Sequence, residues 1–163
     1  MQPTTMSKVT QRPDSPSVRI PPPIYYIAAF LLGLFLQSRI PLPTLPSPAA
    51  LGVGIPLTAL GVLFAGASVA TMLRGHGTLN TAGPSAALVT SGPYRLTRNP
   101  MYLALTLIGG GLACALGITW ALPLLIPVVI YTQIGVIMPE ERYLERTFGD
   151  TYRAYRRRVR RWL

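Results

Sequence analysis

The chain has 163 residues, of which 50% are hydrophobic and only 12% are charged. A soluble domain carries about a quarter charged residues, so this composition excludes an ordinary water-soluble domain and indicates one domain dissolved largely in lipid. The formal net charge is +10, but eight of the fifteen basic residues follow Glu141 and none lies between Met101 and Glu140. Basic clusters beside apolar stretches are typical of cytoplasmic flanks near anionic lipid, and no nucleic-acid-binding motif is present. We therefore expect a lipid bilayer, and no nucleic acid, as a partner.

The chain begins with a polar segment, residues 1–19, rich in Pro, Ser and Thr. It lacks the apolar core of a signal peptide, which predicts a disordered cytoplasmic tail. Residues 20–37 are almost wholly apolar and match the length of a bilayer span. The proline-rich stretch Pro41–Pro48 cannot continue a helix and predicts a loop.

A second predicted span covers residues 49–73, which carry no charge. Small residues within it would let another helix approach closely. They are Gly61, Gly66, Ala67 and Ala70. Residues 77–100 follow as a polar loop long enough to indicate a functional segment.

Residues 101–137 are too long for a single span, and a break at about residues 117–120 divides them. The predicted spans are 101–116 and 121–137. The three consecutive glycines at 109–111 fit either tight helix packing or the close approach of a ligand.

The C-terminal segment, residues 140–163, is charged and helical in pattern. Leu144, Phe148, Tyr152 and Tyr155 are spaced to share one helical face, although Gly149 could interrupt the helix. A strongly basic helix of this kind is typical of a surface helix lying on anionic headgroups.

Four spans would place both termini on one side of the membrane, together with fourteen of the fifteen basic residues, all except Arg39. The positive-inside rule assigns that side to the cytoplasm. The sequence thus predicts an all-α, multi-pass integral membrane protein with about four transmembrane helices and a C-terminal cytoplasmic amphipathic helix. Residues 20–163 would form its single domain.

Two polar segments interrupt this apolar pattern: Ser91–Leu103, the first polar segment, and Pro139–Tyr143, the second. In the first, Asn99 precedes a proline that suits the start of a helix, so its side chain is predicted to cap free backbone N–H groups. A helix start also favours an anionic group. Arg98, Tyr94 and Tyr102 add a positive charge and two aromatic faces with hydroxyls.

The second polar segment contains two adjacent carboxylates, Glu140 and Glu141. Carboxylates are not favoured at the C-terminal end of a helix, so each needs a partner. One reading is a structural ion pair with Arg95 or Arg98. The other is a ligand site, in which a carboxylate accepts hydrogen bonds from an ammonium group or a ribose.

The runs LVTSGPYRLTRNPMYL and PEERYLERTFGDTYRAYRRRVRRWL resemble the membrane methyltransferases of the isoprenylcysteine carboxyl methyltransferase and phospholipid methyltransferase superfamily. Its typical pieces are a GPY-x-x-x-R-[HN]-P-x-Y motif, a later Glu-Glu pair and an FG-x-x-Y-x-x-Y-x-x-x-V ending. All three are present, at Gly92–Tyr102, Glu140–Glu141 and Phe148–Val159. The resemblance covers residues 88–163.

The resemblance implies S-adenosyl-L-methionine as the cofactor, bound at the cytoplasmic face beneath the C-terminal segment, and a lipid or hydrophobic small molecule as methyl acceptor. It also implies a set of cofactor-binding residues: Leu88, Val89, Tyr94, Arg98, Asn99, Tyr102, Glu140 and Glu141. At Leu88 and Val89, nearby backbone groups make the contact. Asn99 stands where the isoprenylcysteine branch has histidine, and Thr132–Met138 lacks that branch's substrate arginine. Both departures favour an acceptor other than prenylcysteine.

The sequence assigns no catalytic residue and no metal ligand set, because His76 and Cys114 are the only histidine and cysteine. Two alternatives to the methyltransferase remain. A membrane reductase of the sterol-reductase type has a similar C-terminal half but is usually larger. A non-enzymatic scaffold binding anionic lipid would explain the arginines but not the two polar segments together. The methyl acceptor and the oligomeric state are left open.

Overall fold

A computed structural model of the chain describes residues 20–44, 47–74 and 88–163. The elements in these ranges are all helical, which confirms the predicted all-α class. The predicted tail, residues 1–19, and the first part of the predicted 77–100 loop lie outside the described residues.

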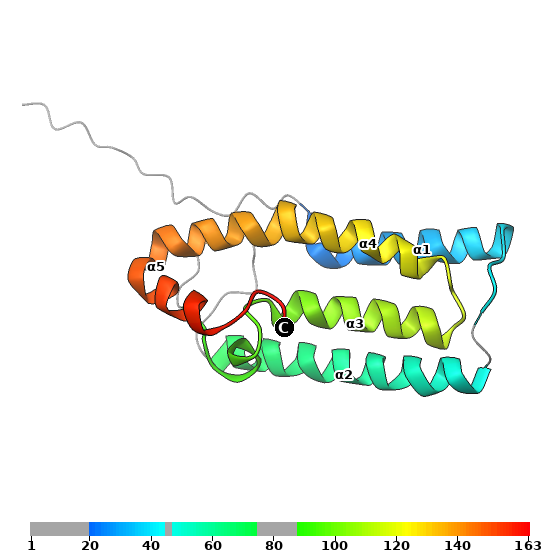
Figure 1. The fold of residues 1–163 in the computed structure, drawn as a ribbon, viewed down its shortest axis with the longest axis horizontal. Coiled ribbons are helices and arrows are strands. Elements are labelled where there is room, and N and C mark those ends of the chain that lie inside the picture. The colour runs from blue at the N-terminus through cyan, green and yellow to red at the C-terminus, as the bar shows by residue number, and fades with distance from the viewer. Residues whose placement is uncertain (1–19, 45–46, 75–87) are drawn as a thin grey trace, which may run out of the picture.

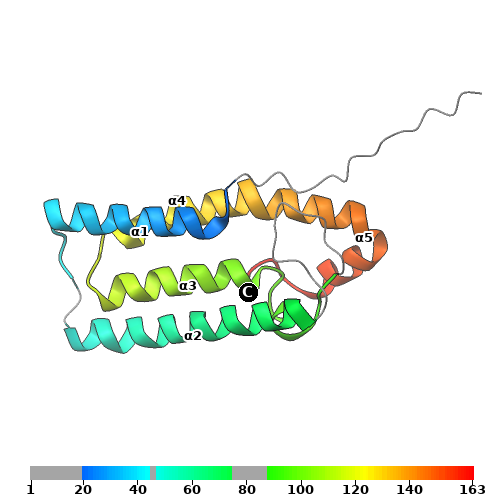
Figure 2. The ribbon, with the colours of Figure 1, turned by 180° about the vertical axis from the view of Figure 1, so that it is seen from behind.

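The described residues form long helical rods packed side by side (Figure 1). The first three are α1 (Pro22–Arg39), α2 (Ser47–Arg74) and α3 (Pro100–Ala115). The fourth is continuous: it consists of α4 (Ala121–Tyr131), the π-helix η2 (Thr132–Ile137) and α5 (Met138–Arg158). A short 3₁₀ helix, η1 (Gly92–Arg95), precedes α3. Successive rods run in opposite directions, with α2 beside α3 and α1 beside α4 (Figures 1 and 2).

Two of the described helices are long and apolar enough to cross a membrane: α2 and the continuous helix Ala121–Arg158. The apolar helix α3 is shorter, and Arg39 ends α1. Large apolar side chains such as Ile27, Leu31 and Leu63 are exposed along α1 and α2, as expected of surfaces that face lipid. The four-span topology and its cytoplasmic orientation stay predictions.

Glycines bring α2 and α3 into backbone contact. A Cβ added at Gly61 would lie 2.9 Å from the backbone oxygen of Ala104, and one at Gly111 would lie 2.6 Å from the backbone nitrogen of Thr58. Gly61 therefore allows the close approach of another helix, as the sequence predicted. Gly66 does not, since a Cβ there would meet nothing within 4 Å. Gly111 of the glycine triplet serves helix packing, because only a hydrogen fits between the two backbones.

The break in residues 101–137 lies where the sequence predicted it. Gly117 has a φ of 65° in the turn between α3 and α4, a conformation that glycine adopts without steric cost. Trp120 then donates its Nε1–H to the Ile40 oxygen at 2.7 Å, and Thr119 donates its hydroxyl to the Pro43 oxygen at 3.0 Å. These bonds tie the two connections at this end of the bundle together.

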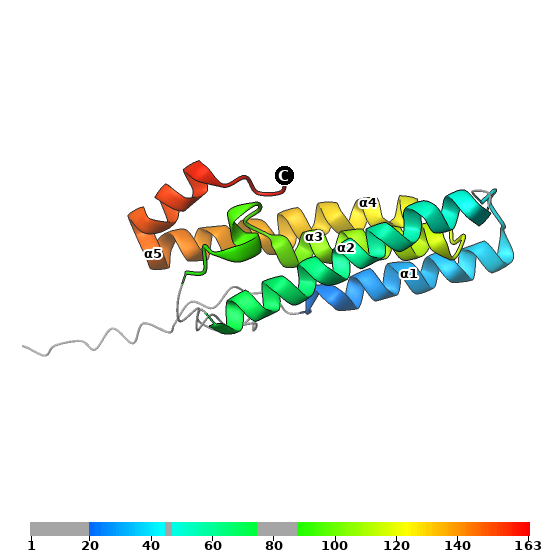
Figure 3. The same cartoon turned by 90° about the horizontal axis from the view of Figure 1, so that it is seen from below.

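At the opposite end, α5 bends sharply at Gly149, where φ is 51° and ψ is −123°. The chain reverses there and carries the C-terminus back to the start of α3 (Figure 3). The prediction that Leu144, Phe148, Tyr152 and Tyr155 share one helical face is therefore wrong, because the bend separates the first two from the last two.

The α2–α3 contact gives a matched pair of substitutions on one helix. We expect Gly61→Ala to lower the free energy of unfolding by about 1–3 kcal/mol, since the new methyl group has to displace backbone. Gly66→Ala should be neutral or slightly stabilising, because its Cβ has open space. Thermal unfolding in detergent measures both, and equal effects would contradict the packing assignment.

The bend at Gly149 yields a second prediction. An alanine there has to adopt a backbone conformation open essentially only to glycine, which costs of order 1–3 kcal/mol, although no atom blocks its Cβ. Gly149→Ala should therefore destabilise the reversal of α5 and raise amide exchange over residues 150–162. Unchanged exchange in that segment would show that the bend tolerates a side chain.

Candidate functional site

The C-terminal segment is bound to the first polar segment. Three donors reach its backbone: Arg98 N–H contacts the Arg160 oxygen, and the Thr97 hydroxyl and Asn99 Nδ2 both contact the Arg161 oxygen, each at 2.9 Å. Thr97 is fully buried and Asn99 is 8% exposed. These bonds hold Arg160 and Arg161 against the turn before α3.

Asn99 occupies the N-cap position of α3, but its side chain makes no capping hydrogen bond. The predicted side-chain cap is wrong, because Nδ2 donates to the Arg161 oxygen instead. The residue thus joins the C-terminal segment to the helix start rather than satisfying the helix itself.

Glu141 is the centre of a buried ion cluster. Its carboxylate lies 2.9 Å from Arg98 Nη1, and both side chains are only 8% exposed. Arg161 binds the same carboxylate with two hydrogen bonds, 3.0 Å from Nε to Oε1 and 2.7 Å from Nη2 to Oε2. The ion-pair reading of the second polar segment therefore holds for Glu141, and its partner is Arg98 rather than the exposed Arg95.

Glu140 differs from its neighbour in having no basic partner among the described residues. Its Oε2 accepts a hydrogen bond from the Tyr102 hydroxyl at 3.0 Å. Burial, and to a lesser degree the adjacent Glu141 charge, raise the pKa of Glu140 above its ordinary value. A half-buried carboxylate with this environment is suited to receive a cationic or hydroxyl group from a ligand.

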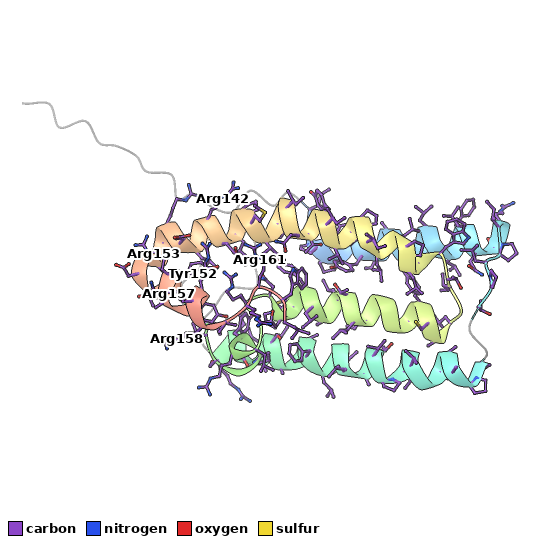
Figure 4. All side chains as sticks on the ribbon, viewed as in Figure 1. Arg142, Tyr152, Arg153, Arg157, Arg158 and Arg161 are labelled. Atoms are coloured by element: carbon purple, nitrogen blue, oxygen red, sulfur yellow. The ribbon has the colours of Figure 1, made fainter. Side chains whose placement is uncertain are left out.

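Aromatic residues surround the two carboxylates. Tyr94 is buried, and its backbone oxygen accepts a 2.7 Å hydrogen bond from the Tyr155 hydroxyl beyond the α5 bend. Burial and the charge of Glu140 raise the pKa of Tyr94 to about 12, so this hydroxyl stays protonated at neutral pH. Tyr152 is almost fully buried, and its hydroxyl lies 3.4 Å from Arg98 Nη1 (Figure 4).

Arg98 has one further donor, Nε, which is buried and has no partner among the described residues. A buried donor left unpaired is costly, so this atom is a candidate for binding an anionic ligand group. Leu88 and Val89 are half-buried in the extended chain just before η1. No described contact joins them to the two glutamates.

The sequence did not single out Gln133, Thr97 or Trp162. The π-helix η2 places the Gln133 side chain 2.8 Å from the indole nitrogen of Trp162, so the fourth rod also holds the C-terminal segment. π-Helices are rare and occur frequently at functional sites. An amide side chain inside the otherwise apolar 121–137 run was the available signal for Gln133.

These features describe a helical protein with a buried polar site at one end of its bundle, and two of its described helices are long and apolar enough to cross a membrane. The family model for phospholipid methyltransferase matches residues 49–151, which include both polar segments. The chain therefore belongs to the phospholipid methyltransferase family, a family of membrane-type methyltransferases. It is also 43% identical over 65 residues to an uncharacterized protein of Haemophilus influenzae, covering 39% of this chain and all of that relative. No solved structure matches the chain.

The two glutamates should respond differently to charge removal. Glu141→Gln leaves the buried Arg98 guanidinium without its carboxylate and removes the pair with the partly exposed Arg161. We expect it to lower the free energy of unfolding by about 3–5 kcal/mol, mostly through the loss at Arg98. Glu140→Gln removes no ion pair and should leave stability near that of the unaltered protein at neutral pH. Thermal unfolding in detergent measures the stability of both variants. Equal losses of stability would contradict this prediction.

Glu140 should also make the stability of the protein depend on pH. Because its folded pKa is raised, its contribution to stability is fully present below the ordinary value of 4.5 and is lost as the pH rises through the folded pKa. Unfolding curves measured upward from pH 4.5 should show this loss in the unaltered protein and not in Glu140→Gln. Parallel curves for the two proteins would contradict the assignment.

Proposed function

We propose that this protein is an S-adenosyl-L-methionine-dependent methyltransferase that acts on a lipid or small hydrophobic acceptor at the cytoplasmic face of the membrane. Family membership supports methyl transfer and a lipid-related acceptor. The observation that supports the cofactor is the contrast within the glutamate pair. Glu141 is neutralised by two arginines, whereas Glu140 has no cationic partner in the part of the chain that the structure describes.

The site residues suit the amino-acid end of this cofactor, which carries an ammonium and a carboxylate. Within residues 20–44, 47–74 and 88–163, the Glu140 carboxylate has no basic partner and the buried Arg98 Nε–H has no acceptor. An anion-favouring helix start follows at Pro100. The pair of opposite charges fits a zwitterionic group better than a purely anionic one.

We assign the predicted cofactor residues to separate roles. Glu140 binds the ammonium or the ribose, with Tyr102 fixing its carboxylate. Tyr94 and Tyr102 supply aromatic faces, and backbone groups near Leu88 and Val89 complete the site. Arg98 binds the cofactor carboxylate.

Glu141 and Asn99 act as positioning residues in this proposal. Glu141 orients Arg98 and Arg161 through short ion pairs. Asn99 binds the C-terminal segment with its Nδ2, which leaves its side-chain oxygen for a ligand. This division explains why the two adjacent glutamates have different surroundings.

When bound, the cofactor supplies an electrophilic methyl group on a sulfonium centre. The chain's contribution is positioning: two charged contacts and two aromatic rings fix the orientation for an in-line displacement. The C-terminal segment is held against the start of α3 by Thr97 and Asn99 and against η2 by Gln133, where it would limit the access of water to a bound cofactor. The acceptor's polar group would approach from the lipid between the helices, and no residue is assigned as its base.

Isothermal titration of the detergent-purified protein tests the cofactor. The unaltered chain should bind S-adenosyl-L-methionine, and Glu140→Gln should weaken binding roughly tenfold to a hundredfold, the value of a charged hydrogen bond. Glu145→Gln is the matched control, because its arginine pairs are solvent-exposed and weak. Binding of NADPH in place of S-adenosyl-L-methionine would support the reductase alternative, and binding of neither would support the scaffold.

The acceptor is tested by transfer of a radiolabelled methyl group from the cofactor into membrane lipid extracts. We expect label in the organic phase with the unaltered protein and, at a cofactor concentration below saturation, roughly tenfold to a hundredfold less with Glu140→Gln. Label confined to water-soluble products would contradict a lipid acceptor while leaving the cofactor assignment in place.

A further inference from the structure

The arginines near the C-terminus divide into two groups by their contacts. Arg153 and Arg156 are bound internally: Arg153 lies 3.0 Å from Asp150, and Arg156 lies 3.1 Å from Glu145. Arg161 is bound to Glu141. These pairs largely neutralise the charges of the three arginines.

Three other arginines, which we call the free arginine set, remain uncompensated. Arg157, Arg158 and Arg160 are all exposed, and none forms an ion pair or a side-chain hydrogen bond with another described residue. Arg157 and Arg158 project from the returning half of α5, whereas Arg142 lies on the other side of the molecule in the same view (Figure 4). The Arg160 backbone is fixed to Arg98, so the set is carried on a rigid base.

Two large exposed apolar residues are linked to this set by chain position and by the bond between Arg98 and Arg160. Leu163, three residues after Arg160, is 72% exposed, and Leu96, two residues before the Arg98 that binds Arg160, is 61% exposed. Water-facing leucines next to uncompensated guanidinium groups do not suit a purely aqueous surface. The combination is the one that stabilises a segment at the boundary between headgroups and acyl chains.

We propose that the free arginine set, with Leu96 and Leu163, is a binding surface for anionic phospholipid headgroups at the same end of the bundle as the polar site. Guanidinium groups bind phosphate oxygens in a bidentate manner, and the leucines contact the upper part of the acyl chains. The surface docks the returning half of α5 on the bilayer. It is separate from cofactor binding, because its side chains make none of the contacts that hold Glu140 or Arg98.

Native mass spectrometry of the full chain in detergent, titrated with phosphatidylglycerol or phosphatidylcholine, tests this surface. The unaltered protein should prefer phosphatidylglycerol, with about a fivefold contribution from each arginine. Replacement of all three, R157Q/R158Q/R160Q, should remove the preference. The matched double variant R153Q/R156Q should keep it within about twofold, since those charges are already neutralised.

Higher salt should reduce the preference, as screening requires. The proposal is overturned if the two lipids bind equally, if the double variant loses as much preference as the triple variant, or if glycerol phosphate or an acidic peptide competes as well as the lipid. Titration of the triple variant with S-adenosyl-L-methionine separates this outcome from the proposed function. Affinity equal to that of the unaltered protein would locate the defect at the lipid surface.

Discussion

The buried cluster of Arg98, Glu141 and Arg161 is the interaction on which the polar end of the molecule depends. Glu141 comes from the end of the fourth rod, Arg98 from the turn before α3, and Arg161 from the C-terminal segment. One carboxylate thus joins three parts of the chain that are far apart in sequence. Buried charges of this kind contribute little net stability when paired but are costly when a partner is lost, so they specify an arrangement more than they strengthen it.

This ion cluster uses Glu141 and leaves the adjacent Glu140 available to a ligand. If both carboxylates of the second polar segment were paired with arginines, the site would hold no group for a cation. Glu140 instead has Tyr102 as its hydrogen-bond donor and a raised pKa from burial. Neighbouring residues with the same side chain can serve structure and ligand binding separately, because a one-residue step on a helix turns the side chain by about 100°.

The α5 reversal brings the C-terminal residues to the polar site. Gly149 allows the chain to turn back, and Tyr152 and Tyr155 then reach Arg98 and the Tyr94 backbone. After the reversal, Arg153 and Arg156 pair with acidic residues, whereas Arg157 and Arg158 form no ion pair with another described residue. Packing between α2 and α3 supplies a rigid base, since glycines at their contact bring the two backbones together.

The sequence by itself determined the all-helical class, the break near Gly117, and the two polar segments with their family resemblance, because hydropathy runs and motif spacing are local properties. Which glutamate is paired was decided only by tertiary structure, since both stand in the same local context. The pairing of Asn99 with the Arg161 oxygen and of Gln133 with Trp162 likewise required the chain to fold back at Gly149. A glycine marks where such a turn is allowed, but these two contacts depend on partners far away in the sequence.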